Sequence, residues 1–257
     1  MNDNFNANGR VIYRGPSMLD GQRIVVVATG FTKKSNNDKT GNMVQTWILL
    51  EDISPADAVN SGADSSVCGD CKHRGEVVVL DGKFKNINRS CYVTIWQAPR
   101  NVWESYHRGI YREATLEELA DICAGFHVRI GSYGDPAAVP TYIWSEATSK
   151  APGFTGYTHQ WRTAPRELAQ YCMASADTVA EYWEAKKLGY RIFRVATDDF
   201  IITGSESRCP ASKEMGNKTD CQTCGACAGL AVASRDKVIK VHGSAAKINA
   251  AVNRLAA

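Results

Sequence analysis

Seven of the nine cysteines in the 257-residue sequence fall into two groups with metal-ligand spacing. The C-terminal group has the pattern C-x11-C-x2-C-x2-C and consists of Cys209, Cys221, Cys224 and Cys227. Its C-x2-C-x2-C run is the spacing that holds three corners of a 4Fe–4S cubane, with a fourth cysteine elsewhere in the chain. Gly225 leaves space for the backbone to turn between these ligands. We therefore predict an iron–sulfur cluster here, with a structural zinc ion on the same thiolates as the alternative.

The N-terminal group has the pattern C-x2-C-x19-C and consists of Cys68, Cys71 and Cys91. Three thiolates leave one iron of a cubane open, and an open coordination position separates a reactive site from a structural one. His73 would instead complete a tetrahedral zinc site that ties this loop to the segment at Cys91. The sequence leaves both alternatives open. The other two cysteines, Cys123 and Cys172, stand alone in apolar segments and are predicted to be small buried side chains.

Polar residues gather where three predicted strands end, in the segments "GSYGDP" (131–136), "YTHQW" (157–161) and "MASAD" (173–177). In a βα barrel, ligand chemistry gathers at the carboxyl ends of the strands. We therefore predict Asp135 and His159 as catalytic residues. The residues predicted to contact a cofactor or substrate are Ser132, Tyr133, Gln160 and Ser175. Structural alternatives exist: Asp135 would cap the turn that follows it, and His159 would be a satisfied core histidine.

Charged residues also lie in or beside predicted strands. Arg129 and Arg194 lie inside such strands, where a buried arginine needs a partner. They are expected either to bind anions or to pair with structural carboxylates. Asp198 and Asp199 follow the predicted strand at 191–197 and are expected to face solvent near the C-terminal cysteines.

Alternating strand and helix patterns must position these residues. Strands are predicted at 23–32, 44–50, 76–82, 127–135, 154–161, 171–175, 191–197 and 237–243. Helices are predicted at 54–63, 102–111, 115–125, 139–153, 164–170, 178–190 and 244–257. This alternation predicts an α/β protein with parallel strands, as a partial or full βα barrel that carries cysteine-rich metal-binding segments. A doubly wound sheet is the alternative, although no GxGxxG or P-loop motif accompanies it.

Two segments are expected along the chain. Residues 1–60 are predicted to form an N-terminal β-rich appendage or flap. Residues 61–257 are predicted to form the barrel-like domain with both cysteine groups. The loop after the first predicted strand, "KKSNNDKTGN" (33–42), is expected to be a hairpin connection or a mobile flap.

The order of these motifs resembles that of phage Gp88-like cysteine-rich proteins of unknown function. The resemblance spans roughly residues 60–245 and rests on "CYV", "VRIGSYGD", "GYTHQW", "CP" and the distal C-x2-C-x2-C run. More distantly, the layout is similar to radical S-adenosylmethionine (radical SAM) enzymes, which hold a cluster with one open iron on three cysteines at the mouth of a partial βα barrel. Those enzymes usually space the three cysteines as C-x3-C-x2-C, which differs from the spacing here. The resemblance implies a phage-encoded protein with S-adenosylmethionine as a cofactor.

Composition narrows the function classes. The net charge of +3 is too small to indicate nucleic-acid binding by itself, and the sequence has neither a long apolar run nor a signal-peptide pattern. We therefore expect a cytoplasmic protein of the infected host cell that does not enter a membrane. The leading hypothesis is an iron–sulfur, radical SAM-like enzyme acting on a nucleotide, nucleic acid or other small substrate. The alternative is a zinc-stapled, non-enzymatic phage protein that binds nucleic acid or a host protein.

Overall fold

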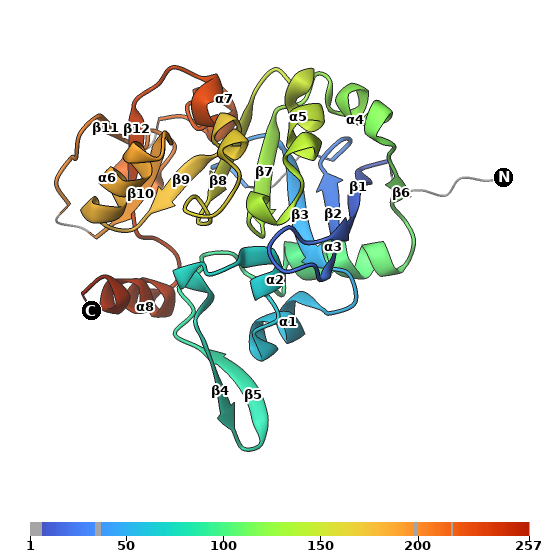
Figure 1. Ribbon diagram of the computed structural model, residues 1–257, viewed down its shortest axis with the longest axis horizontal. Helices are drawn as coiled ribbons and strands as arrows, with labels where there is room; N and C mark the ends of the chain where they lie inside the picture. Colours follow the sequence, from blue (N-terminus) through green and yellow to red (C-terminus); the bar gives the residue numbers. More distant parts are fainter. Residues whose placement is uncertain (1–6, 34–36, 198–199, 217, 257) are drawn as a thin grey trace.

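The computed structural model describes residues 7–33, 37–197, 200–216 and 218–256. Asp198 and Asp199 lie outside these residues. Most of the strands form one ten-stranded sheet (Figure 1). From edge to edge its strands are β11 (Glu206–Arg208), β12 (Asp236–Lys240), β10 (Ile192–Ala196), β9 (Met173–Ala176), β8 (Phe154–Thr158), β7 (Val128–Tyr133), β3 (Val44–Leu50), β2 (Arg23–Thr29), β1 (Gly9–Pro16) and β6 (Arg112–Glu113).

The seven strands from β11 to β3 run parallel to one another. Six of them, β3, β7, β8, β9, β10 and β12, lie side by side in chain order. A doubly wound sheet reverses its strand order at a switch point, and this series has no reversal. The predicted α/β class is therefore confirmed. The full barrel is not, because β11 and β6 remain the two edges of the sheet and no pairing between them occurs in the described residues.

Helices connect these strands and cover the sheet. They are α1 (Pro55–Ser61), α2 (Ser65–Cys68), α3 (Ala98–His107), α4 (Leu116–Cys123), α5 (Thr141–Ser149), α6 (Val179–Lys187), α7 (Cys221–Cys224) and α8 (Ala245–Ala256). Local capping explains where several of them begin. At α4, Glu118 N donates to Thr115 Oγ1 (3.3 Å) and Thr115 N donates to Glu118 Oε2 (3.0 Å), which completes a capping box. At α1, the Ser54 side chain caps the first turn by accepting from Asp57 N (3.2 Å).

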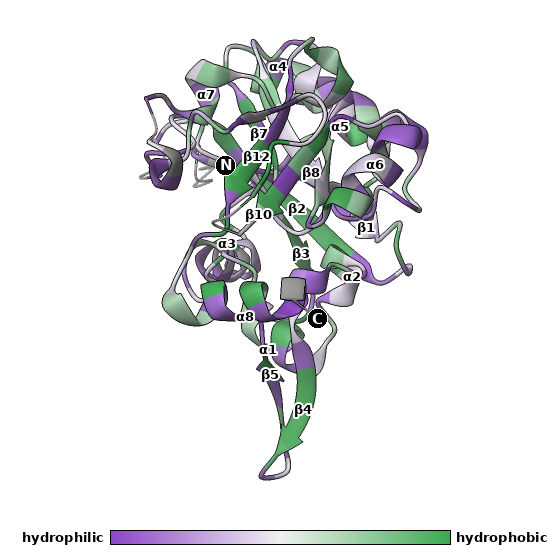
Figure 2. Ribbon diagram, turned by 90° about the vertical axis from the view of Figure 1, so that its left-hand side faces the viewer, coloured by the Kyte–Doolittle hydropathy of each residue, from purple (hydrophilic) through white to green (hydrophobic). Residues whose placement is uncertain are grey.

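Short 3-10 helices fill several connections: η1 (Lys72–Arg74), η2 (Pro136–Ala138), η3 (Arg166–Gln170), η4 (Lys213–Met215) and η5 (Gly229–Ala231). The segment 164–170, predicted as a helix, is this 3-10 turn η3. The strand predicted at 76–82 is β4 (Glu76–Leu80), which pairs with β5 (Lys83–Ile87) in a hairpin that the sequence did not reveal. Figure 2 shows this hairpin projecting away from the body of the molecule.

The first sixty residues supply three strands of the main sheet. β2 pairs antiparallel with β1 and β3, and β3 pairs with β7, so this segment is continuous with the residues that follow. The four central side chains of β2, Val25 to Ala28, are completely buried, because the strand is covered on both faces. In the described part of the chain, no helix has the length and apolarity that a membrane crossing needs.

Candidate functional site

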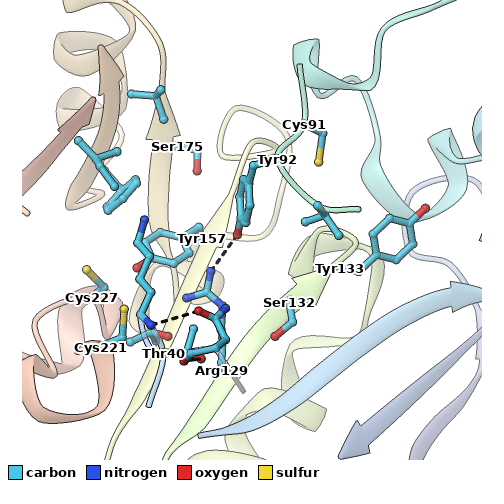
Figure 3. Close-up of a pocket in the computed structure, with 18 of the residues that line it drawn as sticks. Thr40, Cys91, Tyr92, Arg129, Ser132, Tyr133, Tyr157, Ser175, Cys221 and Cys227 are labelled. Atoms are coloured by element: carbon cyan, nitrogen blue, oxygen red, sulfur yellow. Dashed lines mark hydrogen bonds between the residues drawn. The ribbon is translucent and has the colours of Figure 1, made fainter. Parts of the chain in front are cut away.

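A cavity of about 410 Å³ opens against one face of the parallel sheet. Each of the six strands β3, β7, β8, β9, β10 and β12 contributes to its wall. On β3, β8, β10 and β12 the lining residues are two apart, as with Phe193 and Val195 on β10 or Lys237 and Ile239 on β12. Side chains two apart in a strand share one face of the sheet. The cavity is therefore built by the fold as a whole, and both cysteine groups reach it (Figure 3).

The N-terminal cysteine group combines a short loop, which holds two of the cysteines, with a segment that lies about twenty residues further along the chain. Cys68 ends α2, Cys71 directly precedes η1, and Cys91 lies in the connection from β5 to α3. Cys91 N donates to His73 O (3.0 Å), which brings the distant cysteine back to the first loop. Every pair among the three thiols is close enough to interact electrostatically. The three thiols therefore lie within electrostatic reach of one another, and all three residues line the cavity.

A half-buried arginine and a close backbone approach hold this loop in place. Arg74 donates through Nε to Asp64 Oδ1 (3.0 Å) and through Nη1 to Gly69 O (2.9 Å). Gly69 has φ +60° and ψ −137°, a backbone conformation open essentially to glycine alone. A Cβ at this position would lie 2.3 Å from the Gln160 side chain, whose Nε2 donates to Cys68 O (3.1 Å). Gln160 thus positions the cysteine loop and does not line the cavity.

The C-terminal cysteine group lies against the opposite part of the cavity wall. Asp220 caps α7 by accepting from Thr223 N (2.7 Å), which sets the first turn of the run. Cys209 N donates to Val238 O on β12 (2.9 Å), and Gly156 N on β8 donates to Cys227 O (3.1 Å). All six pairs among the four thiols interact electrostatically. These contacts bring Cys209 close to the C-x2-C-x2-C run, although eleven residues separate it from Cys221 in the sequence.

The loop expected to be a hairpin connection or a mobile flap packs against this second group. Lys39 O accepts from Cys221 N (2.8 Å), and Gln222 Oε1 accepts from Asn42 N (2.8 Å). An added Cβ at Gly41 would lie 3.1 Å from the Gln222 side chain. In its described part, from residue 37 onward, the loop therefore supports the metal-ligand candidates.

Six of the seven clustered cysteines are not activated nucleophiles. All of them are free thiols. Burial raises the pKa of Cys71 and of Cys227 to about 12, and it also raises the pKa values of Cys68, Cys91, Cys209 and Cys221. Reactive cysteines have lowered pKa values, so thiolate attack at neutral pH is disfavoured. A bound metal reverses this preference, because a coordinating thiol loses its proton.

Twelve of the thirteen residues predicted to form the site line the cavity, and Gln160 is the exception. Among them, Asp135 has little freedom to act on a ligand, because it accepts from Thr158 Oγ1 (2.7 Å), His159 N (2.7 Å) and Ala137 N (3.0 Å). Burial raises the pKa of Asp135. The capping alternative is thus correct for this residue. His159 has more freedom: its ring packs 5.2 Å from the His73 ring, and neither ring nitrogen has a hydrogen bond in the described structure.

The three predicted binding residues with hydroxyl groups differ in their partners. Ser132 Oγ donates to Gln45 Oε1 (2.5 Å). The Ser175 hydroxyl lines the cavity and has no hydrogen bond in the described residues. Tyr133 Oη is buried without a partner there, and it lies close enough to Cys68 and Cys91 to interact with them. A buried hydroxyl needs an acceptor, and a thiolate-bound cluster at these cysteines would offer sulfur atoms to it.

His73 is not arranged as a fourth metal ligand. Its Nδ1 lies 2.9 Å from Ser90 Oγ and its Nε2 lies 3.2 Å from Asp177 Oδ1, so both ring nitrogens are occupied. Arg254 of α8 also contacts Asp177 (3.3 Å). The zinc site completed by His73 is therefore not formed. Across the residues that the structure describes, no three His, Cys, Asp or Glu side chains converge as one metal ion would require.

The sequence did not show whether the two strand arginines pair with carboxylates or bind anions. The structure gives them different surroundings. Arg194 is paired in the protein core with Glu206, through Nε to Oε1 (2.7 Å) and Nη2 to Oε2 (2.8 Å). Arg129 lines the cavity and donates to Tyr92 Oη (3.0 Å), and it has no ion pair within the described chain. Burial opposes its charge, but contacts with Tyr92, Tyr157 and Cys221 raise the pKa of Arg129 above its ordinary value.

Comparisons with known proteins give no relative for this chain. No protein-family model matches it, and no curated protein or solved structure does so either. The resemblance to phage Gp88-like proteins and to radical SAM enzymes therefore stays a prediction. The functional argument rests on the cavity and its residues.

Proposed function

We propose that this chain is an iron–sulfur enzyme with two cluster sites facing one substrate cavity. Cys209, Cys221, Cys224 and Cys227 would hold one 4Fe–4S cluster. Cys68, Cys71 and Cys91 would hold a second cluster with one open iron. The observation that carries the proposal is that seven cysteines, in two groups separated in sequence, line a single cavity. A structural zinc staple has no need to face a cavity.

The arrangement of the thiols favours a cluster over a single ion. Zinc requires its ligands around one point, whereas a cubane takes one thiolate on each of the irons at its corners. The thiols of each group lie near one another without meeting at one point. The buried hydroxyl of Tyr133 also fits a sulfur-rich partner beside Cys68 and Cys91.

The strand order supports a partial βα barrel of the radical SAM type. Six parallel strands follow one another in chain order, and all six contribute side chains to the cavity. The N-terminal cysteine loop follows β3, the first of the series. When bound, an open iron would supply one electron, obtained from an external reductant, to cleave a carbon–sulfur bond of S-adenosylmethionine. In this scheme His159 moves a proton in the cavity, and Ser132, Tyr133 and Ser175 contact the cofactor or a small substrate such as a nucleotide.

Metal analysis after anaerobic purification tests the proposal. We expect about eight irons and a matching amount of sulfide per chain, falling by roughly half in Cys71→Ala and in Cys221→Ala. Cys123→Ala is the matched control, because this buried cysteine of α4 lies outside the cavity, and its iron content should equal that of the wild type. One or two zinc ions without sulfide would refute the iron–sulfur proposal and favour a zinc-stapled binding protein. Loss of iron in Cys123→Ala would show that the assay reports folding and not ligation.

Cleavage of S-adenosylmethionine by the dithionite-reduced protein tests the radical chemistry separately. We expect methionine to form with the wild type and not with Cys71→Ala. Iron-loaded protein that releases no methionine would retain the iron–sulfur assignment and remove the radical SAM part of the proposal.

A further inference from the structure

Positive charge is concentrated on one side of the cavity. The lining residues include the cations Lys39, Arg129 and Lys237, and Asp135 is the one acidic residue among them. The three cations interact with thiols of the C-terminal group, whereas Asp135 interacts with Cys68 and Cys71 of the other group. In the described residues, none of the three cations forms an ion pair with a carboxylate within 4 Å, although Lys39 also interacts electrostatically with Glu214. This half of the cavity is therefore suited to an anion.

Arg129 differs from the two lysines in its surroundings. Only 9% of Arg129 is exposed, and in the described residues it has no ion pair with a carboxylate. The groups around it include the side chains of Tyr92, Tyr157 and Cys221. A buried charge without a counter-ion is costly unless a ligand balances it. The guanidinium offers five N–H donors in a planar fork that matches a carboxylate or a phosphate. One described hydrogen bond, to Tyr92, uses that fork.

Thr155 provides an independent indication at the same place. It is the register partner of Arg129 on the neighbouring strand β8, and it lines the same cavity. Its side chain is 1% exposed, and within the described structure Oγ1 has no hydrogen-bond partner. Unsatisfied buried hydroxyls are rare in native proteins. A hydroxyl and a guanidinium side by side can share the oxygens of one anion.

The walls around these two residues are aromatic. The Tyr157 and Phe193 rings pack with their centroids 4.6 Å apart, and Tyr92 lies across from them (Figure 3). The cavity volume of about 410 Å³ falls in the range of small-molecule sites. We propose that the cavity binds a small organic anion, held through its carboxylate or phosphate by Arg129 and Thr155 beside the C-terminal cysteine group. This inference rests on the cavity and its two buried polar side chains, and it does not require the iron–sulfur proposal.

Calorimetric titration of the anaerobically purified full-length protein tests the anion site. The probes are benzoate, phenyl phosphate and the neutral analogue benzamide, and the first two distinguish a carboxylate site from a phosphate site. At least one anion should bind about tenfold or more tightly than benzamide. Arg129→Met should remove this preference and leave benzamide binding unchanged. Tyr92→Phe, which keeps the charge and removes the hydrogen bond that orients it, should weaken anion binding by a few-fold.

A stability measurement keeps the inference testable if binding is weak. Arg129→Met removes a buried charge that has no ion pair among the described residues, so it should unfold at the same urea concentration as the wild type or higher. Arg194→Met is the matched control on β10: it leaves Glu206 buried and unpaired, and it should unfold at a clearly lower concentration. Strong destabilisation by Arg129→Met would overturn the inference, because it would identify a structural partner for the charge.

The outcomes separate this inference from the proposed function. Selective anion binding by a protein that contains zinc and no sulfide would support the anion site and refute the iron–sulfur proposal. An iron-loaded protein that binds neither anion more tightly than benzamide would overturn the anion site and make Arg129 a counter-ion of the cluster. Equal anion affinity in Arg129→Met and the wild type would also overturn it.

Discussion

Substitution of Gly69 by alanine should disable the N-terminal cysteine group selectively. Gly69 lies between Cys68 and Cys71, and its φ of +60° with ψ of −137° places it in a region that alanine avoids. An added Cβ would also lie 2.3 Å from the side chain of Gln160, which holds the loop through a hydrogen bond to Cys68 O. Backbone strain and steric overlap would therefore both destabilise the loop that carries two of the three thiols.

The two costs can be estimated. Backbone strain of this kind costs about 1–3 kcal/mol. Steric overlap in a packed site costs about 1–3 kcal/mol in addition. Together they would take a large part of the roughly 5–15 kcal/mol that stabilises an ordinary domain. The protein can avoid them by moving the loop, and movement would separate Cys68 and Cys71 from Cys91.

Urea unfolding and iron analysis of the same variants provide the assay. Gly82→Ala is the matched control, because Gly82 also has a positive φ of +70° but no atom lies within 4 Å of an added Cβ. It should cost about 1 kcal/mol and leave the iron content unchanged. Gly69→Ala should cost at least twice as much, and the second substitution Gln160→Ala should recover the steric part. Equal destabilisation and equal iron content in Gly69→Ala and Gly82→Ala would refute the reasoning.

Two further predictions concern the buried ionic groups around the site. Arg74→Met should destabilise the fold by about 3–5 kcal/mol, because it leaves the Asp64 carboxylate buried and unpaired; an effect below about 1 kcal/mol in urea unfolding would contradict this. Burial raises the pKa of Asp177, but the hydrogen bond from His73 and the nearby positive charges outweigh it and lower that pKa to about 2 from an ordinary 3.8. The contacts of Asp177 thus stabilise the protein fully above about pH 4, and this contribution is lost as the pH falls toward 2. Between pH 5 and 2 the free energy of unfolding of the wild type should fall by about 2 kcal/mol more than that of Asp177→Asn, as measured by urea unfolding at each pH. If the free energies of the two proteins fall in parallel with pH, the carboxylate has no such role.

Local patterns in the sequence were sufficient for most elements of the fold. The β-branched run of β2, the capping box at Thr115 and Glu118, and the helix patterns at α5 and α6 each depend on neighbours within a few residues. The alternation of strands and helices predicted the α/β class for the same reason. The β4–β5 hairpin was missed, because its second strand, "KFKNI", is short and carries two lysines among five residues.

The cysteine spacing determined which residues could hold metal, and the strand ends determined which polar residues could approach a ligand. Sequence alone left unknown that both cysteine groups would face one cavity, since this depends on six strands lying side by side in chain order. It also left open the partners of buried charges. Arg194 and Arg129 have the same setting in sequence, yet Glu206 lies against one and the tyrosines Tyr92 and Tyr157 lie against the other. A local pattern shows that a charge is buried, whereas only the tertiary structure decides what lies opposite it, because that neighbour comes from a different part of the chain.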